Sequence, residues 1–214
     1  HKKLSFDFKA KRFVAGAELE TPDSHLAWRI VLTEDVKKIV LNGYEQFESF
    51  PPSVNFFREA FYHCSAEDEL NRILYIDYRY HLADDLMIKN DRMTMAHSLE
   101  ARVPFTDNEL VKFLATVPVQ CKLPGNKKKY LLRMAMKDFL PQEIIWKKKV
   151  GLEMPYSSWF RKELKDYGDE LFSEARLKSI GLFNTGAISQ LWREHQTMKV
   201  DHGRFFWGLM NYML

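Results

Sequence analysis

The sequence predicts an all-α fold, and three observations support that prediction. Apolar residues recur at helical spacing along most of the chain, and no segment shows a convincing alternation of apolar and polar residues. Only nine of the 214 residues are glycine, which favours helices over tight β-turns. The apolar content of 46% is enough for a core, and the length predicts one domain or at most two small ones.

Capping side chains and prolines mark the expected helices in order. We expect a lead-in segment over residues 1–20, irregular or short-helical, and then a helical portion over residues 21–214. The expected caps are Asp23 or Ser24, Thr33, Ser65 with Asp68, and Thr106 with Glu109, and Pro118 and Pro141 end helices. The helices expected from these signals lie over residues 24–31, 34–41, 54–63, from about 66 onward, 82–103, 107–117, 129–140, 163–172, 185–196 and 203–214. The loop-rich stretch 142–160 is expected to be a connection within one domain.

Residues 82–105 carry the strongest functional signal. This segment is apolar enough to be buried, yet it holds several charged side chains. On a helix, Asp85, Lys89 and Arg92 fall at positions i, i+4 and i+7 and share one face. Asp85 precedes Lys89 in the favourable orientation for an ion pair. Because Pro104 disfavours helical geometry at the residue before it, we expect the helix to end around residues 101–103.

These charges have two interpretations. Burying charges is costly unless they are paired or bind something. The segment is therefore either a structural salt-bridge network inside a helical core or the wall of a site for charged ligands. For Lys89 and Arg92, the structural alternative is an internal salt bridge to Asp84, Asp85 or Asp91.

The same segment resembles the hallmark of the glutamine-dependent asparagine synthetase family. The matching residues are Leu82, Lys89, Asp91-Arg92, Met95-Ala96, Ser98 through Phe105, and Asp107. Weaker matches are His25-Leu26 and Trp28 upstream, and Lys129 through Arg133, Leu140-Pro141, Lys149, Gly151, Pro155 and Trp159 downstream. The resemblance covers roughly residues 20 to 210. It implies the helical C-terminal part of an α/β PP-loop ATP pyrophosphatase (adenine nucleotide alpha hydrolase-like) synthetase domain, without its nucleotide-binding half.

Two hallmarks of that family are missing from the sequence. The family binds ATP through Ser-Gly-Gly-Xaa-Asp-Ser after a strand, a loop that cradles pyrophosphate with backbone N–H groups, but no glycine here is followed by a second one. The family also carries a glutaminase domain with an N-terminal cysteine, whereas Cys64 and Cys121 lie far from either end. The expected partners are therefore the missing glutaminase and nucleotide-binding parts. A stand-alone relative that has lost them is the other expectation.

The resemblance implies a ligase that converts aspartate, ATP and glutamine-derived ammonia to asparagine, AMP and pyrophosphate through an acyl-adenylate. Such chemistry needs fixed cations near the phosphates and usually magnesium. Lys129 matches a lysine that is implied to contact pyrophosphate, and it begins an expected helix, where a cation opposes the dipole unless an anion binds. We predict Lys129 and Arg92 as catalytic residues, and Lys89 and Asp84 as residues that bind the substrate or the nucleotide. The alternative for Lys129 is a solvated basic turn.

Other polar features receive structural interpretations. Glu100 and Arg102 are expected to hold the turn at Val103-Pro104-Phe105. The seven histidines form no ligand spacing, and although Asp84 and Asp85 could suggest magnesium, the family holds its metal in the nucleotide domain, so no metal ligand is predicted. ATP and Mg are expected to bind mainly to the missing half. The closing aromatics, namely Phe205, Phe206, Trp207 and Tyr212, are expected to be core.

Composition excludes several classes of protein. No run approaches the roughly 20 apolar residues of a membrane span, and no signal-peptide pattern is present. Two cysteines without ligand spacing predict a reducing, cytoplasmic setting, and the net charge of +3 does not indicate nucleic acid. A small-molecule carboxylate is the expected substrate, and a homo-oligomer stays open. The alternative function is a non-catalytic helical interaction module derived from the same family.

Overall fold

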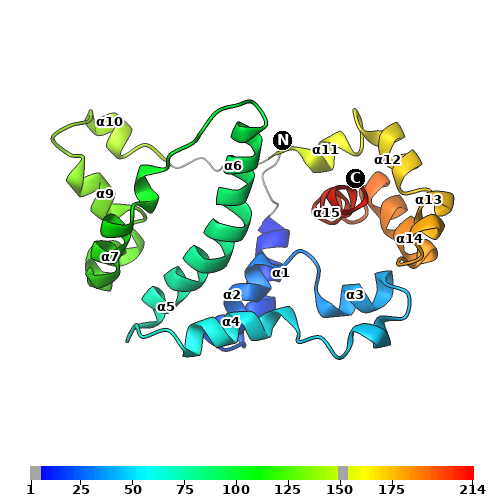
Figure 1. The fold of residues 1–214 in the computed structure, drawn as a ribbon, viewed down its shortest axis with the longest axis horizontal. Coiled ribbons are helices and arrows are strands. Elements are labelled where there is room, and N and C mark those ends of the chain that lie inside the picture. The colour runs from blue at the N-terminus through cyan, green and yellow to red at the C-terminus, as the bar shows by residue number, and fades with distance from the viewer. Residues whose placement is uncertain (1–5, 149–153) are drawn as a thin grey trace. The chain divides into compact units, whose positions relative to one another are not determined.

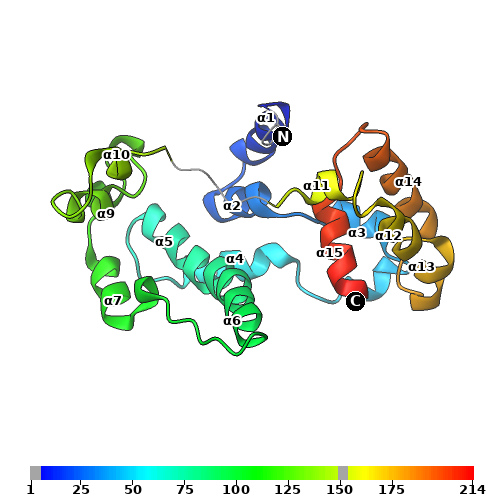
Figure 2. The ribbon, with the colours of Figure 1, turned by 90° about the horizontal axis from the view of Figure 1, so that it is seen from above.

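The computed structural model describes residues 6–148 and 154–214, and all its regular elements there are helical, as Figures 1 and 2 show. The elements are α1 (Phe6–Ala17), α2 (Thr21–Arg29), α3 (Glu34–Val40), η1 (Tyr44–Phe47), α4 (Ser53–Tyr62), α5 (Glu69–Ile76), η2 (Asp77–Met87), α6 (Ile88–Met95), η3 (Pro104–Thr106), α7 (Asn108–Thr116), α8 (Val119–Lys122), η4 (Pro124–Asn126), α9 (Tyr130–Ala135), α10 (Gln142–Ile145), α11 (Tyr156–Trp159), α12 (Lys165–Leu171), α13 (Glu174–Ile180), α14 (Thr185–Gln196) and α15 (Gly203–Met213). The predicted all-α character is confirmed for these residues. The nucleotide-binding half stays a prediction. None of these helices is long and apolar enough to cross a membrane.

The chain divides into two compact units. Unit 1 comprises His1–Trp28 and Ser53–Val150, and unit 2 comprises Arg29–Pro52 and Gly151–Leu214. Helix α1 occupies most of the stretch that was expected to be a lead-in segment. The predicted domain boundary at residue 20 stays a prediction.

Unit 2 has a closed hydrophobic core. Phe206 on α15 is fully buried, and its ring lies 4.8 Å from those of both Phe172 and Trp192. Gly168 on α12 allows the Trp192 ring to approach, because a Cβ there would lie 2.5 Å from it. The other buried members of this core are Val40, Phe160, Leu171, Leu177, Phe183, Ile188, Leu209, Met210 and Met213. Of the four closing aromatics, Phe206 is core, Phe205 and Trp207 are partly buried, and Tyr212 is exposed, so the prediction is wrong for Tyr212.

Unit 1 has a much smaller core. Its buried cluster consists of Ala60, Phe61 and Ile76, with Phe57, Ile73 and Tyr80 partly buried against it. The interpretation that places residues 82–105 inside a helical core is wrong, because η2 and α6 contain no buried residue. Met93 is 62% exposed and Phe105 is 64% exposed. Other apolar side chains of this segment, namely Leu86, Ile88 and Met95, are also exposed.

Two expected helix boundaries in unit 1 are wrong for local reasons. The helix through the charged segment ends at Met95, where we expected residues 101–103. Ser98 adopts the left-handed conformation with φ of 58°, and the Leu99 N–H donates back to the Thr94 carbonyl at 3.0 Å. This turn stops the helix well before Pro104 can act. The expected helix 129–140 is also shorter, since α9 covers Tyr130–Ala135.

Caps were predicted with mixed success. Thr33 caps α3 as predicted, by accepting from the Val36 N–H at 3.3 Å. Asp107, rather than Thr106, caps α7, and the Thr106 hydroxyl donates instead to the Val103 carbonyl at 2.8 Å. The carboxylate at position 68 alone caps α5, and α14 has the predicted bounds.

Candidate functional site

All four predicted site residues lie in unit 1, on three elements. Asp84 lies in η2, which is a π-helix, and Lys89 and Arg92 lie in α6. Figure 1 shows α5 running into α6 as one long helix, with η2 between them. Lys129 is the N-cap residue of α9. The sequence therefore placed three of these residues on one continuous helix correctly.

Lys89 forms the predicted ion pair with Asp85. The Lys89 Nζ lies 2.8 Å from Asp85 Oδ1, and the two side chains are 62% and 50% exposed. His81 Nδ1 approaches the other oxygen of the same carboxylate at 3.6 Å. An exposed pair at this spacing contributes only a few tenths of a kcal/mol, so an anionic ligand could displace Asp85 at little cost. The salt bridge to Asp85, which was the structural alternative for Lys89, is therefore present, but it lies on the surface and not inside a core.

Arg92 and Asp84 are both exposed. Within residues 6–148 and 154–214, neither forms an ion pair within 4.0 Å. An unpaired guanidinium on a surface keeps all five donors available for a phosphate or carboxylate. Arg92 therefore retains the chemistry predicted for it, although the structure gives it no partner.

Lys129 lies at an unusual backbone position. Its φ of 58° is left-handed, and Asn126 and Gly125 just before it are also left-handed. α9 has six residues, so the predicted argument from a helix dipole is weak here. Its exposed side chain is nevertheless placed at a pocket. The prediction of a cation site at Lys129 thus depends on that pocket.

The pocket at Lys129 combines an apolar floor with cations. It has a volume of about 590 Å³, and its lining is Phe105, Lys129, Leu132, Arg133, Met136, Leu140, Ile144, Ile145, Lys147 and Lys148. These residues include four cations and no carboxylate. The Arg133 guanidinium lies 5.3 Å from the centre of the Trp146 ring, a distance typical of a cation–π contact. Such a pocket favours an anionic group at its rim.

A second pocket adjoins the segment that carries Arg92. It has a volume of about 520 Å³, and its lining is Met87, Asn90, Asp91, Ala101, Arg102, Val103, Pro104, Thr106 and Asp107. The turn η3 separates the two pockets, since Pro104 and Thr106 line one and Phe105 lines the other. Arg102 pairs with Glu100 at 2.5 Å on the surface, so their predicted role in holding the turn stays a prediction. The structure does not bring Asp84, Lys89, Arg92 and Lys129 into a single pocket.

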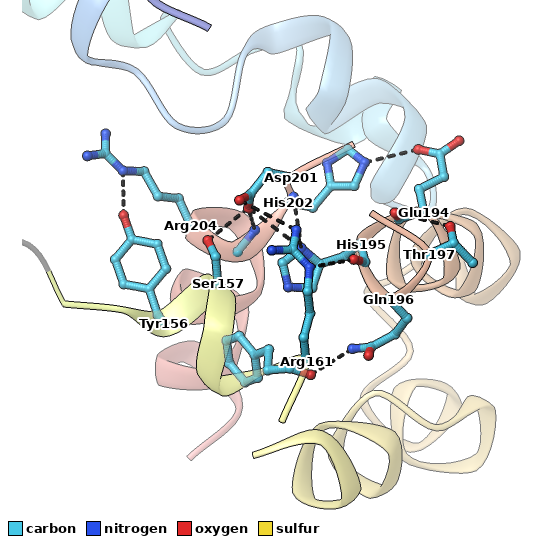
Figure 3. A network of polar contacts seen from close by, with 12 residues as sticks. Tyr156, Ser157, Arg161, Glu194, His195, Gln196, Thr197, Asp201, His202 and Arg204 are labelled. Carbon is cyan, nitrogen blue, oxygen red and sulfur yellow. Dashed lines mark hydrogen bonds and ion pairs between the residues drawn. The ribbon is translucent and has the colours of Figure 1, made fainter. Parts of the chain in front are cut away.

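Unit 2 contains a polar cluster around the fully buried His195, which sequence reasoning missed (Figure 3). His195 Nδ1 accepts from Arg161 Nη2 and from the His202 backbone N–H, both at 3.2 Å. Its Nε2 is buried and has no hydrogen-bond partner among the described residues. Burial and the positive charge of Arg161 lower the pKa of His195 to about 4, so the ring is neutral at pH 7.

The same cluster does not form a nucleophile. The Ser157 hydroxyl donates to Asp201 Oδ1 at 2.8 Å instead of to His195, so the histidine cannot act as its base. Although burial tends to raise the pKa of Asp201, hydrogen bonds from the Gly203 N–H and Ser157, with the Arg161 charge, hold it below its usual range. The sequence offered no signal for these contacts, because they join residues up to 44 positions apart. We interpret the cluster as a structural support for α15.

The described residues fit the phosphates of a nucleotide better than a metal ion. The cations at the first pocket and Arg92 suit phosphate oxygens. No group of three or more His, Cys, Asp or Glu among the described residues could hold a metal ion. No step is therefore assigned to magnesium bound by this part of the chain. Lys149 and Gly151, two weaker positions of the family resemblance, lie outside the described residues.

Comparisons with known proteins address the resemblance directly. The model of the asparagine synthase family matches residues 5–214. Asparagine synthetase [glutamine-hydrolyzing] 1 of Bacillus subtilis is 28% identical over 193 residues, which cover 90% of this chain and 30% of that protein. The asparagine synthetases of Mus musculus and Gallus gallus are 29% and 33% identical, over 82% and 65% of this chain and 33% and 25% of those proteins. No solved structure matches the chain significantly. The chain spans a third or less of these relatives, and it belongs to the asparagine synthase family.

Proposed function

We propose that this chain is the C-terminal part of an ATP-dependent, amide-forming ligase of the asparagine synthetase type. In this proposal it supplies cationic side chains to the phosphate end of a nucleotide site that another part of the protein completes. The observation that carries the proposal is the first pocket, whose charged lining residues are all cations and include Lys129. The relatives also support the proposal, because they are described as glutamine-hydrolysing asparagine synthetases.

The proposed chemistry explains why cations are needed. ATP activates the carboxylate of aspartate as an acyl-adenylate, pyrophosphate leaves, and ammonia derived from glutamine then displaces AMP. Negative charge grows on the leaving phosphates in the first step, and fixed positive groups stabilise that charge. Lys129 would act as a point charge, while Arg92 can donate two parallel hydrogen bonds to two oxygens.

Lys89 and Asp84 have binding roles in this proposal. Lys89 would exchange its exposed partner Asp85 for a phosphate or for the substrate carboxylate, a change that the low energy of an exposed pair allows. Asp84 has free acceptor oxygens and would accept a hydrogen bond from a group of the completed site. Magnesium would be held with the phosphates by the part of the protein that completes the site.

The exposed apolar surface of unit 1 supports the proposal that other parts of a longer protein pack on it. Large side chains on α6 and on the segments after it are more than half exposed, namely Met93, Met95, Leu99, Phe105, Phe113, Phe139 and Ile144. Where such side chains gather into one patch, they typically mark an interface. We therefore expect the nucleotide-binding and glutaminase parts as partners, and we expect the isolated chain to release no pyrophosphate from ATP and aspartate.

The sequence encoded just upstream of His1 provides the first test. A Ser-Gly-Gly-Xaa-Asp-Ser run after a predicted strand would support the proposal, and its absence from any upstream coding sequence would contradict it.

The second test uses the complete polypeptide and measures pyrophosphate release. We expect Lys129→Ala to lower the rate by about 100-fold, as loss of a fixed transition-state charge does. Lys128→Ala is the matched control, because Lys128 is adjacent but does not line the pocket.

A non-catalytic interaction module is the second candidate function. Two observations favour it: most residues that line the first pocket are apolar, and Lys89 already has a partner in Asp85. In that case Lys129→Ala and Lys128→Ala would have equal effects on any activity of the complete protein. Substitution of the apolar floor, for example Ile144→Ser, would then weaken association without changing catalysis.

A further inference from the structure

The long helix of unit 1 changes its winding at one defined place. Residues 69–76 are α-helical, Asp77–Met87 form a π-helix, and α6 follows directly. π-helices are rare, usually occupy a single turn, and occur frequently at functional sites. An eleven-residue π segment is therefore a feature that requires an explanation.

The π segment determines the direction of the residues that follow it. A π turn takes roughly one residue more than an α turn, so eleven residues complete about half a turn less than they would in an α-helix. The side of α6 on which Lys89 and Arg92 lie, relative to α5, therefore depends on whether residues 77–87 keep the π form. A return to α geometry would rotate both cations together.

The first turn of the π segment is fixed to α2 and α4. His25 Nε2 on α2 lies 2.7 Å from Asp77 Oδ1, with the two side chains only 12% and 27% exposed. Since a carboxylate only accepts, the histidine nitrogen donates. The Tyr80 hydroxyl donates to the Phe56 carbonyl at 3.2 Å, and its ring stacks on Phe57 at 5.4 Å.

Other contacts between these helices lie away from the π segment. Thr21 Oγ1 on α2 donates to Glu69 Oε1 at 3.0 Å, at the start of α5. Arg58 on α4 pairs with Asp23 on α2 by donating from its Nε and its Nη2 to the two carboxylate oxygens. These contacts keep α2 packed even if His25 is replaced, so the effect of His25 is separable from the fold of unit 1.

We infer that His25 is a positioning residue: its hydrogen bond to Asp77 holds the start of the π segment and so fixes the side of the helix on which Lys89 and Arg92 face the ligand. The identity of the ligand in this inference rests on the proposed function. The effect of His25 on the helix does not. His25 does not touch the ligand. It acts through Asp77 and through the winding of the ten residues that follow.

A distance measurement tests the geometry in the chain itself. One nitroxide label is placed on the native, exposed Cys121 of α8 and the other on α6 through Asn90→Cys, with Cys64→Ser to leave two labels. We expect His25→Leu to displace the α6 label by up to about 10 Å, the diameter of a helix with its side chains. His25→Gln can still donate to Asp77 and should restore the original distance. Thr21→Val, which removes a contact of the same helix pair outside the π segment, should not change it.

The functional readout uses the complete polypeptide. We expect His25→Leu to lower the rate of pyrophosphate release by about 10- to 100-fold, as a misplaced group does, and His25→Gln to regain most of it. If His25→Leu does not fold, Asp77→Asn, which weakens the same bond, should give a partial displacement of the label. An unchanged label distance in His25→Leu, or an equal change in Thr21→Val, would overturn the inference. Failure of the Lys129 test with a displaced label would overturn the proposed function and leave the geometry of His25 intact.

Discussion

The two units of this chain bury their apolar side chains to very different degrees. Unit 2 encloses twelve buried residues in one core and supports them with a buried polar cluster around His195. The main buried cluster of unit 1 has three residues, and many of its large apolar side chains are exposed. Since folding must offset a large conformational entropy, we expect unit 1 to be less stable than unit 2.

Core truncation should reveal the largest contrast between the units. We expect Phe206→Ala in unit 2 to cost about 3–5 kcal/mol, because it leaves a cavity between Phe172 and Trp192. Phe113→Ala in unit 1, where the ring is 61% exposed, should stay within about 0.5 kcal/mol. Urea unfolding followed by amide hydrogen exchange measures both units separately. Equal costs would mean that unit 1 has a core that its exposed rings do not suggest.

Acid should destabilise unit 2 in a window set by His195. The pKa of His195 is about 4 in the folded state, below the ordinary value of 6.5. As the pH falls from about 6.5 to 4, the unfolded state therefore binds a proton at this histidine that the folded state does not bind. The loss should reach about 3 kcal/mol at the lower end, at 1.36 kcal/mol per pH unit. The contribution of Asp201, whose pKa is lowered, is present throughout this window and is lost only at lower pH. His195→Asn should remove this slope in amide exchange of unit 2, and a persistent slope would assign it to another group.

A pair of glycines on α15 tests how tightly unit 2 is packed. A Cβ on Gly203 would lie 2.8 Å from the Ser157 Cα and closer still to its hydroxyl. Because backbone atoms cannot yield easily, Gly203→Ala should cost about 1–3 kcal/mol. Gly208→Ala on the same helix meets nothing within 4 Å and should stabilise by about 0.5–1 kcal/mol. Thermal unfolding measures both, and a gain from Gly203→Ala would show that α15 can move away from Ser157.

Two similar ion pairs should give the smallest difference between the units. Lys165 pairs with Asp169 in unit 2, and Lys89 pairs with Asp85 in unit 1, both at i, i+4. Asp169 also accepts from the Trp192 indole N–H at 2.7 Å. We expect Asp169→Ala to cost about 1–1.5 kcal/mol and Asp85→Ala only about 0.3 kcal/mol. If the two costs are equal in urea unfolding, the indole contact adds no stability.

Local signals in the sequence predicted local structure well. The spacing of apolar residues predicted an all-α chain, Thr33 predicted its own cap, and the i, i+4 spacing predicted the pair of Asp85 with Lys89. The end of the helix at Met95 was missed, because it depends on a left-handed serine at position 98 that no propensity rule favours.

Features that join distant residues could not be predicted. An apolar segment predicts contact with another surface, but it does not identify that surface. The exposure of residues 82–105 was therefore not predicted. The grouping of residues 29–52 with residues 151–214 could not be predicted, because these segments lie far apart in the sequence. The π segment and the environment of His195 likewise depend on partners that pattern reasoning cannot identify. The predicted roles of Asp84, Lys89, Arg92 and Lys129 depend on family resemblance more than on geometry.

The link between residues 29–52 and the rest of unit 2 has a consequence for synthesis on the ribosome. The Asn42 N–H donates to the Leu182 carbonyl at 2.8 Å, the Asn184 N–H donates to the Val40 carbonyl at 2.9 Å, and α15 supplies four members of the same core. Residues 29–52 therefore cannot complete their core contacts until about 160 further residues have been translated, which takes on the order of ten seconds or more. During that interval Val40 lacks the core partners that α15 supplies.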